Sequence, residues 1–298
     1  MRGAGMLDNN QAGDNISGDS NSAAEVSFPA GDMKRPEATR VITVSNQKGG
    51  VGKTTTTVNL AAALALEGMQ VLVIDNDPQG NASTALNVPH SSEVPSTYDV
   101  LIEGTPLSDV VQDCPDVDNL VVAPATIDLA GAEIELVSLE DRNVRLATAI
   151  RDYAEYREAN GLPRLDFVFI DCPPSLGLLT VNAFVAAREV LIPIQSEYYA
   201  LEGLSQLLSN IELIREHLNP ELAVSAILLT MYDGRTNLSS QVAEEVRGHF
   251  PDQALDSVIP RSVRISEAPS FQQTVLTYDP TSTGALAYIN VARELLNK

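Results

Sequence analysis

The sequence has few cysteines and no long apolar segment. Its two cysteines, Cys114 and Cys172, are too few for a disulfide framework, which favours a reducing cytoplasm. No run of about 18 or more apolar residues occurs, so no transmembrane helix is expected. The N-terminus lacks a basic stretch followed by an apolar one, and we expect no signal peptide. These absences predict a cytoplasmic protein without a membrane partner.

Basic residues are also scarce. The 298 residues include 19 lysines and arginines against 40 aspartates and glutamates, so the net charge is −21. This charge argues against nucleic-acid binding over the whole surface. Any contact with DNA must therefore come from a local basic patch. Two of the few lysines, Lys48 and Lys53, lie in one loop, which suggests a role with phosphate.

The two ends of the chain differ in composition. Residues 1–38 are rich in Gly, Asn, Ser, Ala and Asp and have little apolar periodicity, which predicts a disordered tail. At 298 residues the chain is long enough for one large α/β domain or two small ones. No internal repeat and no second core is evident. We therefore predict a single domain after the tail.

The stretch from Val41 to Gly68 organises the rest of the chain. Its sequence is VITVSNQKGGVGKTTTTVNLAAALALEG. Val41 to Val44 predict a buried strand, and the pattern from Thr54 is helical and ends at Gly68. A strand, a glycine loop and a helix in this order are typical of a phosphate-binding loop. The loop's N–H groups and the helix N-terminus can surround an anion.

The loop supplies most of the predicted nucleotide site. Lys53 can reach the β- and γ-phosphates, and the Thr54 hydroxyl can ligate Mg²⁺. A glycine-rich turn with two solvated lysines is the alternative, and the flanking strand and helix argue against it. The loop residues predicted to bind nucleotide are Lys48, Gly49, Gly50, Val51, Gly52, Lys53, Thr54 and Thr55.

Two further apolar strands end in aspartates. Residues 71–74 lead into Asp75 and Asp77, and residues 167–170 lead into Asp171. Carboxylates at the C-terminal ends of parallel strands face the ligand crevice of an α/β sheet. Asp77 can position or activate the attacking water, and Asp75 can hold the Mg²⁺ shell or the loop. Asp171 is expected to hold Mg²⁺ through water; the predicted metal site is Thr54, Asp77 and Asp171.

Alternating elements define the predicted fold class. Strands are expected at 120–123, 190–194 and 223–229, with helices starting near 129 and spanning 142–160 and 201–218. This alternation predicts an α/β fold: a single P-loop NTPase domain with a doubly wound, mostly parallel sheet flanked by helices. Residues 89–119 are interpreted as an irregular insertion with a short helix near 98–102.

Two of these predicted helices carry more detailed expectations. The helix at 142–160 is predicted to bury Ile150, Tyr153 and Ala154. On the helix that starts near residue 129, Glu133 and Glu135 are interpreted as surface or interface residues without a catalytic role.

The run K-G-G-V-G-K-T, from Lys48 to Thr54, resembles the deviant Walker A motif of the ParA/MinD family of ATPases. The run D-N-D-P-Q-G-N-A that begins at Asp75 is similar to the second signature of that family. The resemblance implies that Lys48 reaches across a dimer interface to the partner's nucleotide and that Asp77 is needed for hydrolysis. It also implies ATP and Mg²⁺ as cofactors and a homodimer that forms on ATP binding. Lys48, Lys53 and Asp77 are thus the expected catalytic residues.

The run I-P-R-S-V-R-I-S-E-A-P-S, from residue 259 to 270, resembles the chromosome-partitioning ParA/Soj branch. In that branch, arginines that match Arg235 and Arg264 bind DNA without sequence preference. The same resemblance makes Met231, Tyr232 and Pro260 walls of an adenine pocket. It further implies a ParB-type partner that stimulates hydrolysis, and association with the nucleoid. Ordinary surface arginines with acidic partners are the alternative.

Other functions of this wider family remain as alternatives. A MinD-like membrane-surface regulator needs a basic amphipathic helix at the C-terminus, but residues 285–298 are typical of a core-packing helix. An iron–sulfur electron donor needs two cluster cysteines, which the positions of Cys114 and Cys172 do not favour. A GTP-specific relative would carry an N/T-K-x-D motif, which is absent. A nucleotide binder without hydrolysis stays open.

Overall fold

The computed structural model describes residues 34–197 and 200–298, and the predicted tail over residues 1–38 lies largely outside them. Eight strands form one sheet in the order β3-β4-β2-β5-β1-β6-β7-β8. They are β1 (Arg40–Val44), β2 (Val71–Asp75), β3 (Gln112–Asp113), β4 (Leu120–Ala123), β5 (Phe167–Asp171), β6 (Glu189–Gln195), β7 (Ala223–Tyr232) and β8 (Ala254–Pro260). All pairs are parallel except β3 with β4, which confirms the predicted fold class.

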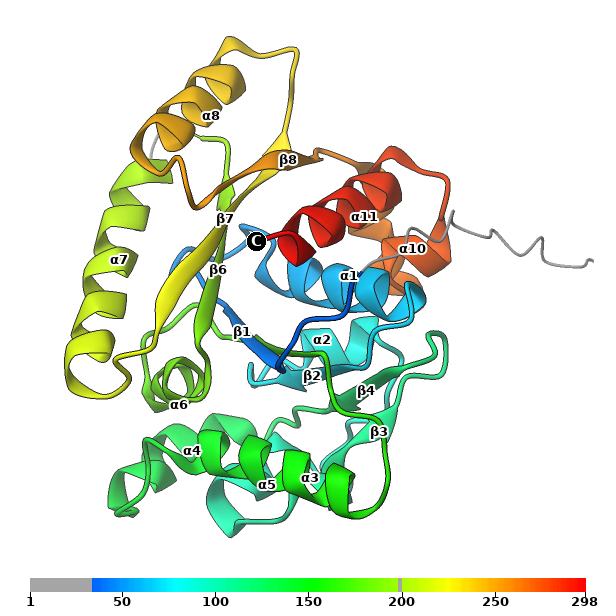
Figure 1. Ribbon diagram of the computed structural model, residues 1–298, viewed down its shortest axis with the longest axis vertical. Coiled ribbons are helices and arrows are strands. Elements are labelled where there is room, and N and C mark those ends of the chain that lie inside the picture. Colours follow the sequence, from blue (N-terminus) through cyan, green and yellow to red (C-terminus); the bar gives the residue numbers. More distant parts are fainter. Residues whose placement is uncertain (1–33, 198–199) are drawn as a thin grey trace, which may run out of the picture. The chain divides into compact units, whose positions relative to one another are not determined.

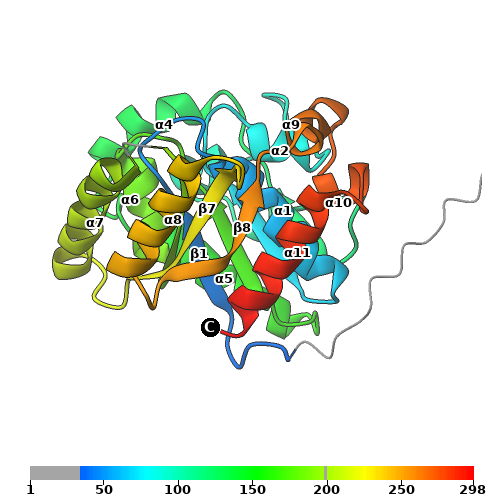
Figure 2. The ribbon, with the colours of Figure 1, turned by 90° about the horizontal axis from the view of Figure 1, so that it is seen from above.

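Helices cover both faces of the sheet (Figures 1 and 2). One face carries α1 (Lys53–Leu66), α2 (Asn81–Ala85), α10 (Val275–Tyr278) and α11 (Thr283–Leu296). The other carries α5 (Arg145–Ala159), α6 (Leu178–Ala186), α7 (Ala200–His217) and α8 (Asn237–His249). The shorter elements are η1 (Asp99–Glu103), α3 (Leu107–Val110), α4 (Leu129–Glu135), η2 (Leu136–Ser138), α9 (Val263–Glu267) and η3 (Ala268–Phe271).

The order of the strands creates a switch point at β1. From β1 the chain crosses to β2 on one side of it, and β5 later fills the position between them. From β5 the chain then passes to β6 on the other side of β1. Ligands of open α/β sheets bind outside the C-terminal ends of the strands at such a point. The loop between β1 and α1 lies there.

Helix α1 is the central helix of its face. Its apolar residues are buried on nearly all sides, because the sheet lies on one side and α11 on the other. Gly68 follows its end with φ +85°, a left-handed conformation that favours glycine, as the sequence predicts. The predicted end of this helix is therefore confirmed.

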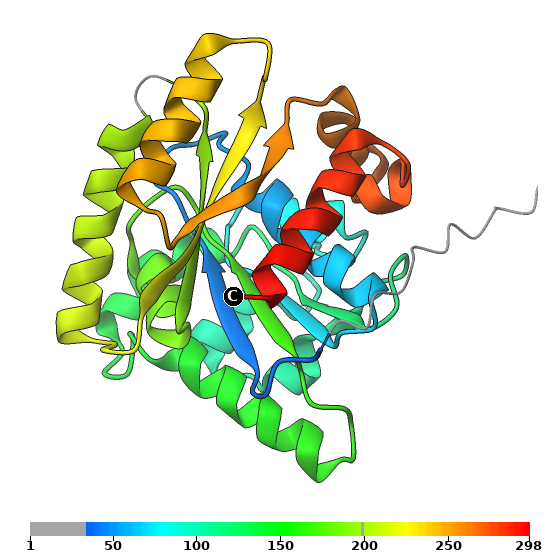
Figure 3. The same ribbon diagram turned by 45° about the horizontal axis from the view of Figure 1, so that its top comes forward.

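The last helix, α11, packs into the core beside α1 and β8 (Figure 3). Tyr288, Val291 and Leu295 are among its buried residues, which confirms the prediction of a core-packing helix. A helix that buries its apolar face in this way does not offer that face to a lipid surface. Among the described residues, none of the helices has both the length and the apolar character needed to cross a bilayer.

Two details differ from the sequence-based expectations. Helix α5 buries Leu146, Ile150, Tyr153 and Arg157, whereas Ala154 is exposed, so its predicted burial is wrong. The buried residues recur at intervals of three and four, and Ala154 lies one position to the side of that stripe. Within the segment 89–119, η1 confirms the short helix, but α3 and the antiparallel strand β3 were not predicted.

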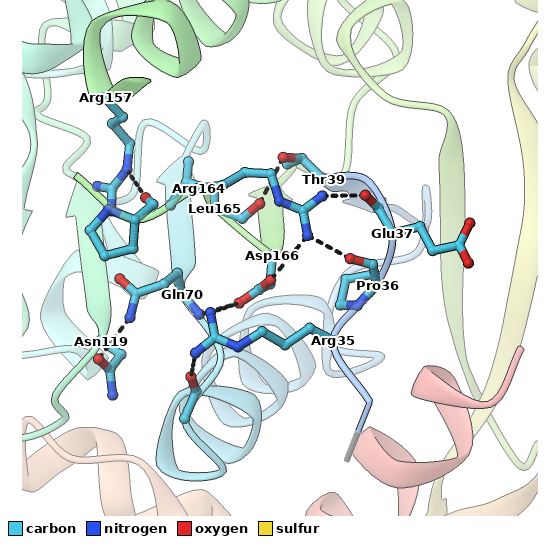
Figure 4. Close-up of polar contacts among 12 residues, drawn as sticks. Arg35, Pro36, Glu37, Thr39, Gln70, Asn119, Arg157, Arg164, Leu165 and Asp166 are labelled. Atoms are coloured by element: carbon cyan, nitrogen blue, oxygen red, sulfur yellow. Dashed lines mark hydrogen bonds and ion pairs between the residues drawn. The ribbon is translucent and has the colours of Figure 1, made fainter. Parts of the chain in front are cut away.

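A buried carboxylate stabilises the edge of the sheet at which the parallel strands begin, opposite the edge that carries the loop between β1 and α1 (Figure 4). The side chain of Asp166, directly before β5, is 1% exposed, and its Oδ2 accepts a 2.8 Å hydrogen bond from the Gln70 N–H. Arg35 and Arg164 approach the carboxylate to 3.2 and 3.5 Å. Arg164 also donates to two carbonyls of the segment that precedes β1. This cluster ties that segment to β5.

The substitution Asp166→Asn tests the contribution of this cluster. Asn keeps an acceptor for the Gln70 N–H but removes the charge that two arginines face. We expect the free energy of unfolding to fall by about 1–3 kcal/mol in urea titration. Asp152→Asn is the matched control, because the exposed Asp152–Arg151 pair should contribute far less to stability. Equal losses in the two variants would contradict this account.

Candidate functional site: the phosphate-binding loop and its carboxylates

The loop between β1 and α1 has the backbone geometry of an anion cradle. Gly50 and Gly52 have φ of +76° and +89°, values that residues with a side chain rarely adopt. Gly52 is the N-cap of α1, and its carbonyl accepts the first helical hydrogen bond, from Thr56, at 2.8 Å. The N–H groups of the loop and those of the first turn of α1, which have no acceptor within the helix, therefore lie next to each other at the N-terminus of α1.

The two lysines of the loop have different environments. Lys53 is 7% exposed, and its ammonium lies 3.4 Å from the carbonyl oxygen of Lys48, across the loop. Burial lowers the pKa of Lys53, and the charges of Asp171 and Asp77 act in the opposite direction. The Lys48 side chain is 49% exposed, and its Nζ lies 2.7 Å from Oε2 of Glu197, after β6. The Lys53 side chain thus lies inside the site, and the Lys48 side chain lies at its surface.

Asp171 connects the end of β5 to the start of α1. Its two carboxylate oxygens accept hydrogen bonds from the hydroxyls of Thr54 at 2.7 Å and Thr57 at 3.0 Å. Burial, and then the charge of Asp75, raises the pKa of Asp171. The adjacent Thr54 and Asp171 oxygens fit a hard cation such as Mg²⁺, which takes few protein ligands and completes its shell with water and phosphate.

Asp75 ends β2 and Asp77 lies two residues beyond it, and the two carboxylates have different surroundings. The Asp75 carboxylate accepts from the N–H and hydroxyl of Ser83 at 2.8 and 2.7 Å and from the Asp77 N–H at 3.3 Å. Burial raises the pKa of Asp75. Asp75 thus orders the turn that carries Asp77, and no hydrogen bond joins it to the loop in the described part of the chain. Asp77 is 7% exposed, and its charge acts to raise the pKa of Lys53.

A hollow of about 230 Å³ adjoins the loop, and two of the three residues predicted to form an adenine pocket line it. Met231 and Pro260 line it together with Gly52 and Thr55. Tyr232 does not line it, because its hydroxyl points to Ser240 on α8, 3.4 Å away.

The backbone at Met231 explains how it reaches the hollow. Met231 has φ +51°, and the β7–β8 register shifts between Leu229 and Tyr232. A left-handed non-glycine residue at a bulge is strained, and such strain is typical of functional sites.

The two predicted DNA-contact arginines lie beyond the ends of neighbouring strands. Arg235 precedes α8 and its side chain is 89% exposed, whereas Arg264 lies on α9 and is 55% exposed. Arg261, between them at the end of β8, was not predicted. It is exposed, lines the hollow, and its charge helps to lower the pKa of Asp233. Its place in the same I-P-R-S-V-R run was the available signal.

Several anchors of the loop come from distant parts of the chain. The Thr230 hydroxyl lies 2.8 Å from the Val51 carbonyl oxygen, which ties the loop to β7. Asn46 accepts from the Lys48 N–H at 3.0 Å and donates to the Pro193 carbonyl at 2.9 Å. The local sequence does not identify these contacts, because Thr230 and Val51 are 179 positions apart and Asn46 and Pro193 are 147 apart.

Glu133 has a structural role that the sequence did not reveal. Its carboxylate accepts from the N–H groups of Leu178 at 2.7 Å and Leu179 at 3.3 Å, the first residues of α6. It thus satisfies unpaired donors at a helix N-terminus. Its neighbour Glu135 is exposed, as expected, and among the described contacts its carboxylate accepts only from the Tyr98 hydroxyl.

Comparisons with known proteins agree with this geometry. Residues 39–224 match a family model described as AAA domain. The sporulation initiation inhibitor protein Soj of Bacillus subtilis is 50% identical over 256 residues, which cover 86% of this chain and 98% of that protein. The chromosome partitioning protein ParA of Myxococcus xanthus is 48% identical over 260 residues, covering 87% and 88% of the two chains.

A solved structure shares the fold. It is cobyrinic acid a,c-diamide synthase from Mycobacterium smegmatis with bound ADP and magnesium, and it superposes with a TM-score of 0.73 at 35% identity. The match covers 87% of this chain and 94% of that chain. A protein of this fold therefore holds a nucleotide and magnesium.

The substitutions Glu133→Ala and Glu135→Ala separate a helix cap from a surface carboxylate. We expect Glu133→Ala to lower the free energy of unfolding by about 1 kcal/mol, because two N–H groups of α6 lose their acceptor. Glu135→Ala should change it by less than about 0.5 kcal/mol. Urea denaturation of both variants measures the difference, and a larger loss for Glu135→Ala would show that the cap is unimportant.

Proposed function

The chain belongs to the ParA/Soj family of chromosome-partitioning ATPases, and from this we propose that it is an ATP-dependent switch for DNA segregation. With ATP and Mg²⁺ it forms a homodimer that binds DNA non-specifically, so that it associates with the nucleoid. A ParB-type partner stimulates hydrolysis, and the dimer then separates and releases DNA. The related structure with ADP and magnesium supports the choice of ligand.

The contrast between the two loop lysines carries this proposal. Lys53 is 7% exposed and its ammonium lies across the loop, 3.4 Å from the Lys48 carbonyl oxygen, so it neutralises the phosphates of its own subunit's nucleotide. The Lys48 side chain is half-exposed, and among the described residues its ammonium pairs only with Glu197, so it is free to reach a nucleotide on a second subunit. An exposed ion pair contributes about 0–1 kcal/mol, and a triphosphate can replace Glu197 at small cost.

Hydrolysis then needs positioning more than covalent chemistry. The loop N–H groups, Lys48 and Lys53 stabilise the charge that develops on the phosphoryl group. Asp77 holds the attacking water in line. Mg²⁺, when bound, neutralises phosphate charge, and Thr54, Asp77 and Asp171 are the residues proposed to hold it, directly or through water. Intrinsic turnover is slow, as a switch requires.

DNA binding depends on a local patch in this acidic chain. Arg235 and Arg264 lie near the C-terminal ends of β7 and β8, at the edge of the sheet that carries the nucleotide site. Each subunit of a chain with net charge −21 offers only a small patch. Dimerisation doubles the number of phosphates contacted, and affinity rises steeply with that number.

Lys53→Ala and Lys48→Ala should affect different steps. Lys53→Ala should reduce ATP affinity at least about 100-fold, because the main cation at the β- and γ-phosphates is lost. Lys48→Ala should bind ATP within about 3-fold of wild type but stay monomeric. Titration with a fluorescent ATP analogue measures binding, and sedimentation with ATP and with ADP measures assembly. An ATP-dependent dimer of Lys48→Ala would refute the cross-subunit role.

Arg235→Ala combined with Arg264→Ala should remove DNA binding and spare the dimer. Loss of two phosphate contacts per subunit should weaken binding at least about 10-fold and flatten its dependence on salt. Anisotropy of a labelled DNA duplex at several salt concentrations measures both effects. Sedimentation with ATP should still show the dimer. Unchanged DNA affinity in the double variant would show that DNA binds elsewhere.

A further inference from the structure

Each arginine proposed to bind DNA is already paired with carboxylates of its own chain. Arg235 donates from Nε and from its terminal nitrogen to both oxygens of Asp233, each at 2.8 Å. Arg264 lies 3.2 Å from Asp279 and 3.4 Å from Glu267. A phosphate that approaches either guanidinium must therefore compete with a carboxylate at the same donors.

Asp233 is the fixed member of its pair. Its side chain is 23% exposed, whereas that of Arg235 is 89% exposed. The Asp233 Oδ1 also accepts from the backbone N–H of Arg235 at 3.1 Å, which closes a turn before α8. The hydrogen bonds from Arg235 lower the pKa of Asp233 to about 2, so the carboxylate is charged at any physiological pH.

Arg261 is the third arginine near Arg235 and Arg264, and it makes the number of positive and negative side chains there equal. Arg261 makes no ion pair within the described chain, and its backbone N–H donates to the Tyr232 carbonyl at 3.0 Å, next to Asp233. The patch thus contains Arg235, Arg261 and Arg264 against Asp233, Glu267 and Asp279. Its net charge is close to zero within a strongly acidic chain, so it has little long-range attraction for DNA.

We propose that Asp233, together with Glu267 and Asp279, is a built-in counter-ion that holds the DNA affinity of one subunit low. This inference rests on the proposed function. A neutral patch on one subunit retains little DNA, whereas two patches on one dimer contact enough phosphates to bind. The counter-ions therefore make DNA binding depend on the assembled state, and they favour release when the dimer separates.

Asp233→Asn tests the inference in the full-length protein. Asn keeps an oxygen that can accept from the Arg235 N–H, so the turn is retained while one negative charge is lost. With ATP at low salt, we expect about 3- to 10-fold tighter binding of a labelled DNA duplex, because a charge near contact distance changes affinity by roughly this factor in water. The gain should shrink as salt rises, since screening weakens it.

Glu221→Gln is the matched control. It removes the same charge from an exposed ion pair, with Arg188 at 3.0 Å, but lies before β7, at the opposite edge of the sheet. Its effect on DNA affinity should be below about 1.5-fold. Asp279→Asn tests the Arg264 pair independently and should also tighten binding.

A double-mutant cycle shows whether Asp233 acts through Arg235. In an Arg235→Ala background, Asp233→Asn should add less than about 2-fold to affinity. Equal effects of Asp233→Asn and Glu221→Gln would overturn the inference, and so would weaker DNA binding by Asp233→Asn. Either result leaves the DNA proposal intact if the variant without Arg235 and Arg264 still loses binding. No DNA binding by wild type or by Asp233→Asn with ATP would overturn both.

Discussion

The hydrogen bonds of Asp171 are the constraint on which the site depends. Two hydroxyls of α1, from Thr54 and Thr57, donate to its carboxylate at the end of β5. Since β5 lies between β2 and β1, these bonds fix the first turn of α1 against the centre of the sheet. The direction of the loop N–H groups, and the place where a phosphate can bind, follow from that position.

The charged side chains at the C-terminal ends of the central strands are buried, and burial determines how they interact. Lys53, Asp75, Asp77 and Asp171 are all at most 7% exposed, and a buried charge is costly unless it is paired or hydrogen-bonded. Asp75 and Asp171 receive these partners from Ser83 and from the threonines of α1. The low dielectric also strengthens each remaining interaction with phosphate and metal. At the same edge Arg235 and Arg264 are exposed to water and pair with carboxylates of their own chain.

Much of the fold and the position of the phosphate-binding loop could be predicted from local patterns. Apolar runs identified six of the strands, five of them within one residue at each end and β7 with its C-terminal end three residues short; the glycines and Lys53 identified the loop. Predictions of the direction in which a single side chain points were less accurate. Ala154 is exposed and Tyr232 turns to α8, because one residue along a helix or strand changes the direction of a side chain.

The sequence by itself determined the order of strand, loop and helix, since hydrophobic period and glycine backbone freedom act over a few residues. It also placed carboxylates at strand ends. Only the tertiary structure decided which groups meet: Lys48 and Glu197 are 149 positions apart, and Thr57 and Asp171 are 114 apart. Such contacts depend on the order in which strands pair, and that order is fixed by packing of the whole sheet against its helices.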